Sequence, residues 1–486
     1  LLKPPEFDQE VFFITKGKRR KIMKKKLRRY IGDRQFYKML LAIVVPIIIQ
    51  NGITNFVSLL DNLMVGRIGT EQMSGVAIVN QLIFVFNLCI FGAVSGAGIF
   101  TAQFFGHGDY EGVRNTFRFK FLISIAFSVI GIAAFVSAGS QLVSLFLHEG
   151  GESGDIMQTL KYGEQYLGWI LIGLLPFALS QVYSGTLRET GETIVPMVAG
   201  VAAVFVNLIF NYLLIYGSFG FPKLGVEGAA IATDISQVLS CIFALWFLMR
   251  VPDIYRINPK KLSIDRTMAG RIIQVGLPTA IQNTVISFSN VLVQSGVNGF
   301  GASAMAGFGA YLKVDGFNIL PVMSFSMAAT TFTGQNYGAG KTDRIRKGLR
   351  VTLGMSVLYT IVTGILLLTF SRPIIGIFSS DKEVIYYGAQ AMKYFCPFYF
   401  LLGIMHSLAG TIRGTGKTVP PMVVMLLALC LFRILWIQFV VPHFTSIDII
   451  YVLYPVSWAV GMVLMLIYAW KGNWMPKKYQ NINQTV

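Results

Sequence analysis

Apolar runs long enough to cross a lipid bilayer recur along the whole chain, and they constrain its fold more than any other feature. A transmembrane helix needs about 20 predominantly apolar residues. Hydrophobic residues make up 54% of the chain and charged residues 13%, too few polar side chains to cover the surface of a soluble protein. The sequence therefore predicts an all-α polytopic membrane protein with twelve transmembrane helices, at roughly 39–64, 74–99, 117–146, 161–184, 193–217, 227–249, 268–293, 303–331, 349–378, 384–409, 418–441 and 447–470.

The net charge of +18 is unevenly placed. Ten basic residues fall within 16–29 (KGKRRKIMKKKLRR), directly before the first span, and alternate loops are also basic. The positive-inside rule then predicts a multi-pass plasma (inner) membrane protein with both termini in the cytoplasm. The loops placed on that side carry Arg114, Arg118, Lys120, Arg256, Lys260, Lys261, Arg266, Lys341, Arg344, Arg346, Lys347, Arg413, Lys417, Lys477 and Lys478.

The basic segment before the first span favours contact with lipid headgroups over binding of nucleic acid, because it adjoins the bilayer and lacks interleaved aromatic residues. No cleavable signal precedes the first span, so we expect that span to direct insertion. The four cysteines fall inside apolar spans, and together with the four histidines they show no disulfide or metal-ligand spacing. We expect no cofactor and a monomer.

The chain contains an internal repeat. A shift of 232 residues aligns FTAQFFGHG (100–108) with FTGQNYGAG (332–340), and a shift of 225 aligns LRETGETIVPM (187–197) with IRGTGKTVPPM (412–422). The repeat unit is six spans, and six is even, so the two halves run in parallel about an axis normal to the bilayer, a plan common in secondary transporters. It predicts two six-helix bundles with a cleft between them that opens alternately to each side.

The predicted boundaries follow from the repeat. They are a basic cytoplasmic segment at 1–35, an N-terminal six-helix bundle at 36–250, a cytoplasmic linker at 251–270, a C-terminal six-helix bundle at 271–471 and a cytoplasmic tail at 472–486.

The two nonamers are interpreted as turns after spans 2 and 8, where glycine permits close approach and glutamine bonds exposed backbone at a helix end. GTGKT (414–418) resembles a phosphate loop, but position 411 is Thr where that motif requires Gly. We therefore exclude ATP hydrolysis and predict that the chain is not an enzyme.

Three acidic residues lie deep in predicted spans: Asp61, Asp234 and Asp315. A charge at a helix centre costs about 3 kcal/mol, so such residues have a partner or a function. Pro46 lies in the same span as Asp61 and removes a backbone hydrogen bond, which allows the helix to bend. Asn207 and Asn211, four residues apart, share one helix face and offer carbonyl oxygens.

The chain resembles the multidrug and toxic compound extrusion (MATE) family over about 36–470. The resemblance is carried by TGQNYGAG, the LRETG/IRGTG pair, LLDNLMVGRIG (59–69), NLIFNYLLIYG (207–217) and GVEGAAIAT (225–233). It implies export of cationic or amphipathic compounds driven by inward H⁺ or Na⁺. It also implies that Pro46 and Asp61 take part in cation coupling, and that Thr233 completes a cluster with Asn207 and Asn211 that is able to hold Na⁺.

Some family members have Asp at the position of Asn211. With one acid fewer here, the case for tight Na⁺ binding is weaker, and the sequence does not decide between H⁺ and Na⁺ as the coupling ion. In the second half the 232 shift places Val293 opposite Asp61, and we expect coupling in the first half only. Lys313, Asp315 and Arg433 form either an ion-pair network or a site for substrate or protons. Asp234 either faces the cleft and attracts cationic substrate or pairs elsewhere.

The sequence leaves three functions open. The favoured one is a cation-coupled exporter of small cationic or amphipathic molecules. A flippase for lipid-linked precursors, from the wider superfamily, is the second. A membrane receptor or membrane-embedded enzyme is the third, disfavoured by the repeat and by the absence of a nucleophile–base pair.

Overall fold

The computed structural model of the chain describes residues 34–145, 156–250 and 265–475. The basic segment at 16–29, linker residues 251–264 and the tail from 476 lie outside the described residues. Within them the chain is helical and contains no strand. The first half comprises α2 (Arg34–Gly66), α3 (Thr70–His107), α4 (Tyr110–Ser144), α5 (Ile156–Glu189), α6 (Ile194–Tyr216), η1 (Ser218–Gly220) and α7 (Val226–Arg250).

The second half repeats this order with more interruptions. It comprises α8 (Arg266–Asn298), α9 (Ala302–Gly338), α10 (Thr342–Thr369), α11 (Ser371–Gly376), α12 (Lys382–Phe395), η4 (Cys396–Phe398), α13 (Tyr399–Gly414), α14 (Val419–Leu426), η5 (Leu427–Leu431), α15 (Phe432–Phe439), η6 (Val441–His443) and α16 (Asp448–Lys471).

The predicted all-α architecture is confirmed in the described residues. Ten helical segments are long and apolar enough to cross a membrane; α8 and α9, of 33 and 37 residues, are as long but richer in polar side chains. The predicted ninth span is broken after Thr369, because Pro373 has no N–H to donate to the Thr369 carbonyl. Pro397 likewise places a 3₁₀ turn inside the tenth span.

Each half has its own apolar core. The core of the second half is aromatic and gathers Phe308, Tyr311, Phe395, Tyr451 and Trp458. Two smaller clusters join the halves: one packs α2 against α9 and α10, and the other packs α3 and α4 against α8. These joining clusters involve equivalent helices of the two halves, as a parallel repeat requires.

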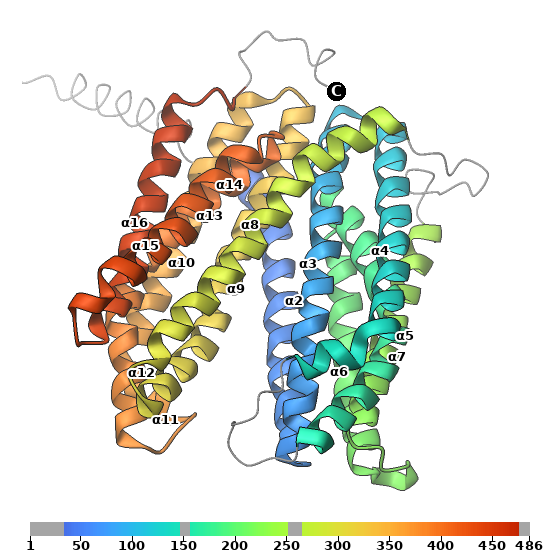
Figure 1. Cartoon of the computed structure of the whole chain (residues 1–486). Helices are drawn as coiled ribbons and strands as arrows, with labels where there is room; N and C mark the ends of the chain where they lie inside the picture. Colours follow the sequence, from blue (N-terminus) through green and yellow to red (C-terminus); the bar gives the residue numbers. More distant parts are fainter. Residues whose placement is uncertain (1–33, 146–155, 251–264, 476–486) are drawn as a thin grey trace, which may run out of the picture.

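The bundles come together at one end of the molecule and diverge toward the end that carries α11 and the α6–α7 connection (Figure 1). At the convergent end, Gln103 Nε2 donates to the Gly414 carbonyl at 2.9 Å, and Gln335 Nε2 donates to the Glu189 carbonyl at 2.8 Å. The prediction that the nonamer glutamines bond backbone at a helix end is confirmed, and in both cases the helix belongs to the opposite half.

Glycine permits this contact. A Cβ on Gly106 would collide with the Gln335 carbonyl, and a Cβ on Gly338 with the Gln103 carbonyl. The 232 shift pairs the two glycines as it pairs the two glutamines. We name Gln103, Gln335, Gly106 and Gly338, with the carbonyls they meet, the clasp.

Candidate functional site

Asp61, Asn207, Asn211 and Thr233 come together from three helices of the first half. Asn211 Nδ2 donates to Asp61 Oδ1 at 2.5 Å, and the amide groups of Asn211 and Asn207 lie 3.1 Å apart. The Asn207 amide also lies 3.2 Å from the Thr233 hydroxyl. When its nitrogen is turned toward the carboxylate, that nitrogen lies 3.0 Å from Asp61 Oδ2. The four residues therefore form one connected polar cluster.

The helices hold this cluster in place through local geometry. Residues four apart on α6 lie on one face, so both asparagines point toward α2 and α7. Asn207 and Asn211 are buried, while Asp61 and Thr233 are partly accessible. The Tyr216 hydroxyl donates to the Met64 carbonyl at 3.0 Å, which fixes the end of α6 against the end of α2.

Two cations fit this chemistry. The Asp61 carboxylate takes a proton directly. Sodium favours oxygen ligands, and the carboxylate, two rotatable amides and the threonine hydroxyl supply them. In either case a change of charge at Asp61 would alter its hydrogen bonds to α6.

Pro46 lies fifteen residues before Asp61 in the same helix and is buried. Its missing N–H leaves the Ala42 carbonyl without the usual helical partner. The Thr193 hydroxyl, at the start of α6, donates to that carbonyl at 2.6 Å. Helix α2 is thus tied to α6 at both the proline and the aspartate.

The other candidates do not join this cluster. Asp315 accepts from the Tyr399 hydroxyl at 2.7 Å, and Tyr399 lies 2.9 Å from the Tyr311 hydroxyl. Arg433 donates to Ser457 at 3.1 Å and to Asn290 at 3.1 Å. In the described ranges no direct ion pair joins Lys313, Asp315 and Arg433: Asp315 accepts from a phenol, Arg433 donates to neutral partners, and the attraction between Asp315 and Arg433 acts at longer range. The network and the alternative site for substrate or protons both stay predictions.

Lys313 and Asp234 also lie outside the Asp61 cluster. Lys313 is exposed and lies 5.7 Å from the centre of the Phe378 ring. Asp234 is buried in the α5–α7 interface, against Gly173. Neither residue lines the cavity between the halves described next.

A cavity of about 410 Å³ lies between the two halves, with walls from α3, α5, α8, α9 and α13. Its apolar walls include Phe84, Phe91, Phe177, Met323 and Met327. Its charged lining, among the described residues, consists of Arg188, Glu189 and Arg413. Sequence reasoning missed these three as site residues, although the LRETG/IRGTG alignment pairs the two arginines.

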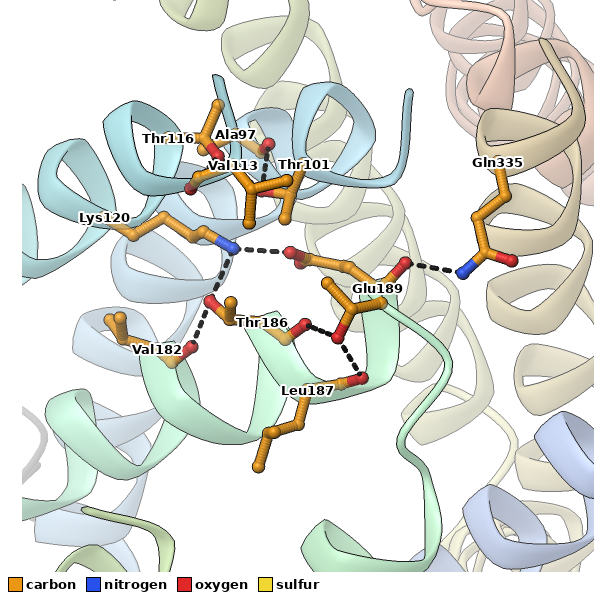
Figure 2. A network of polar contacts seen from close by, with 11 residues as sticks. Ala97, Thr101, Val113, Thr116, Lys120, Val182, Thr186, Leu187, Glu189 and Gln335 are labelled. Carbon is orange, nitrogen blue, oxygen red and sulfur yellow. Dashed lines mark hydrogen bonds and ion pairs between the residues drawn. The ribbon is translucent and has the colours of Figure 1, made fainter. Parts of the chain in front are cut away.

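Glu189 is held by a buried lysine of α4. Lys120 Nζ lies 2.5 Å from Glu189 Oε2 and 2.9 Å from the Thr186 hydroxyl, and its side chain is fully buried. Figure 2 shows this pair beside Gln335, which reaches the Glu189 backbone carbonyl. The assignment of Lys120 and Arg118 to a basic loop is corrected, because α4 begins at Tyr110 and both residues are buried within it. Arg413 lies likewise in α13.

The chain was compared with known proteins. The sequence model of the MatE family matches residues 46–213 and 278–437, one match in each half. A probable multidrug resistance protein NorM of Thermotoga maritima is 30% identical over 405 residues, covering 82% of this chain and 84% of that protein. An FAD transporter of Shewanella oneidensis is 24% identical over 380 residues, covering 78% and 82%.

Solved structures agree on the fold. One described as the outward-facing conformation of a multidrug resistance MATE family transporter of the MOP superfamily superposes with a TM-score of 0.80 at 19% identity, covering 91% of this chain and 96% of that one. The matched family model, the relative at 30% identity and the duplicated helical fold lead to one conclusion: this chain belongs to the MATE family of membrane transporters.

Proposed function

We propose that this chain is a secondary active antiporter that exports amphipathic compounds in exchange for H⁺ or Na⁺ by alternating access. The observation that carries the proposal is the contact between Asp61 and Asn211, inside a cluster that also contains Asn207 and Thr233. A partly accessible carboxylate bonded to two buried amides of another helix gives an ion a place where its binding changes helix–helix contacts.

The clasp supports alternating access. The halves are joined by two reciprocal hydrogen bonds at one end, and a cavity with walls from both halves adjoins that end. On the charge distribution of the sequence, we assign the clasp end to the cytoplasm, with both termini on that side of the plasma membrane and the chain acting as a monomer. Release of the clasp would open the cavity to the cytoplasm.

The cargo is proposed as amphipathic, without the cationic preference that the family resemblance implied. The deep acids that would favour a cation, Asp61, Asp234 and Asp315, do not line the cavity. The two arginines in the lining give the flippase for lipid-linked precursors a specific observation in its favour, and it stays the second candidate. Several relatives are named multidrug resistance proteins, which favours export of small molecules.

The test is efflux of a fluorescent dye from vesicles under separately imposed H⁺ and Na⁺ gradients, comparing wild type with Asp61→Asn. We expect one gradient to drive wild-type efflux and the variant to lose at least tenfold in rate. Asp343→Asn, an exposed acid at the start of α10, is the matched control and should retain wild-type rates. Equal efflux by Asp61→Asn and wild type under either gradient would refute the coupling role.

A further inference from the structure

We infer that the cavity between the halves binds amphipathic anions, compounds with a carboxylate, sulfonate or phosphate group at one end of an apolar, aromatic body. The inference deepens the proposed function by naming the class of cargo, and it rests on that proposal only for the statement that the bound compound is exported.

The two arginines are equivalent positions of the repeat that meet at one cavity. Arg188 lies in the last turn of α5 and Arg413 in the last turn of α13, and the 225 shift superimposes them. Both line the cavity. A pseudo-two-fold arrangement therefore presents two guanidinium groups, one from each half, to the same space. Guanidinium groups bind carboxylate and phosphate through paired N–H donors.

In the described residues, the guanidinium N–H groups of Arg188 form no hydrogen bond with the protein. Within the described ranges Arg188 makes no side-chain hydrogen bond and no ion pair, and its neighbour Glu189 is engaged by Lys120. Arg413 uses Nη2 to donate to the Ser326 hydroxyl at 2.9 Å, which leaves its other donors available. Both arginine side chains are partly accessible.

The charge balance of the cavity favours an anion. Among the described lining residues the charged groups are Arg188, Arg413 and Glu189. Lys120 lies 2.5 Å from the Glu189 carboxylate, which also attracts the neighbouring Arg188 guanidinium. Three positive groups and one negative group leave a net charge of +2 at this part of the cavity. A cationic ligand would have to lie beside this net positive charge in a site of reduced dielectric, where repulsion is strong.

The rest of the cavity accepts an apolar body. Phe84, Phe91 and Phe177 from the first half and Met323 and Met327 from the second line it. Flat aromatic rings and flexible thioethers adapt to ligands of different shape. A volume of about 410 Å³ falls in the range of sites for small organic molecules.

The test is equilibrium binding of two xanthene dyes of opposite charge, fluorescein (anionic) and rhodamine 6G (cationic), to the purified full chain in lipid nanodiscs, read by fluorescence anisotropy. Empty nanodiscs give the lipid background. Wild type should bind fluorescein more tightly than rhodamine 6G, and fluorescein affinity should fall as NaCl is raised. Tighter binding of rhodamine 6G to wild type would overturn the inference.

Substitutions locate the site. Arg188→Gln should weaken fluorescein binding about tenfold, as loss of a charge-assisted hydrogen bond does, without weakening rhodamine 6G. Arg188→Lys should recover part of the loss, because it restores the charge but not the paired donors. Lys417→Gln removes one exposed charge four residues after Arg413 and should leave both affinities unchanged. Unchanged fluorescein affinity in Arg188→Gln would also overturn the inference.

Equilibrium binding needs no ion gradient, so the two proposals fail separately. A chain that binds fluorescein through Arg188 but shows no gradient-driven efflux contradicts the antiport proposal and leaves this one standing. Gradient-driven efflux of rhodamine 6G together with weak, Arg188-independent fluorescein binding contradicts the anion site and leaves the antiport proposal standing.

Discussion

At the residue scale, the buried pair of Lys120 and Glu189 places two charges inside the helical bundle. Bringing charges out of water costs several kcal/mol per ion, and a close partner offsets that cost. Here the offset comes from a contact of 2.5 Å and from the Thr186 hydroxyl. The pair also shapes the cavity, because Lys120 balances the negative charge of Glu189 in the lining.

Replacing one member should therefore be more harmful than replacing both. Lys120→Met is expected to lower the unfolding free energy by about 3–5 kcal/mol, since it leaves an unpaired carboxylate in the bundle. Lys120→Met combined with Glu189→Gln should recover most of this loss. Thermal unfolding in detergent measures the effect. The control is Arg114→Gln, which breaks a surface pair with Glu111 on the same helix and should lower the unfolding free energy by about 1 kcal/mol or less. An equal loss of unfolding free energy in Lys120→Met and Arg114→Gln would contradict the argument.

At the scale of a single element, helix α2 lacks one backbone hydrogen bond at Pro46, and a side chain at the start of α6 replaces it. The Ala42 carbonyl, left free by Pro46, accepts from Thr193 of the α6 start. In Pro46→Ala the new N–H would compete for the same carbonyl, and α2 would depend less on α6.

This predicts coupling between the two positions. Thr193→Val should destabilise wild type by about 1 kcal/mol, the usual net value of one hydrogen bond, and should be nearly neutral in a Pro46→Ala background. A double-mutant cycle on unfolding free energies measures the interaction. Strictly additive effects would show that the Thr193 hydroxyl does not compensate for the backbone hydrogen bond that Pro46 removes.

At the scale of the whole molecule, the clasp closes one end of the cleft. Gly338→Ala places a methyl group against the Gln103 carbonyl of the other half, so the halves must separate there. We expect a longer distance between spin labels at Tyr110 and Lys341, both exposed beside the clasp, in a background without the four native cysteines. Gly354→Ala, on α10 where a Cβ meets nothing, should leave the distance unchanged; an unaltered distance in Gly338→Ala would contradict this account of the clasp.

The sequence predicted the repeat and the helical architecture from local periodicity, and it placed Asn207 and Asn211 on one helix face because they are four residues apart. That Asp61 and Thr233 join these asparagines was implied only by the resemblance to the MATE family, since no local pattern brings α2 and α7 to α6. The sequence did not predict the cavity charge. Lys120 and Glu189 are 69 residues apart, and their neutralisation depends on how α4 packs against α5. Asp234 and Asp315 do not line the cavity because of the way their helices are rotated in the bundles. An apolar run predicts a spanning helix but not its rotation about its own axis.

The central claim is that ion occupancy at Asp61 controls which end of the cleft is open. Its most direct test is the distance between spin labels at Phe219, in η1 between α6 and α7, and Ile377, which directly follows α11; both are highly exposed. The α6–α7 connection and α11 lie at the divergent end of the two halves (Figure 1). In wild type the distance distribution should shift when the driving ion is added, and in Asp61→Asn the same addition should produce no shift. An ion-dependent shift of equal size in Asp61→Asn would contradict the claim.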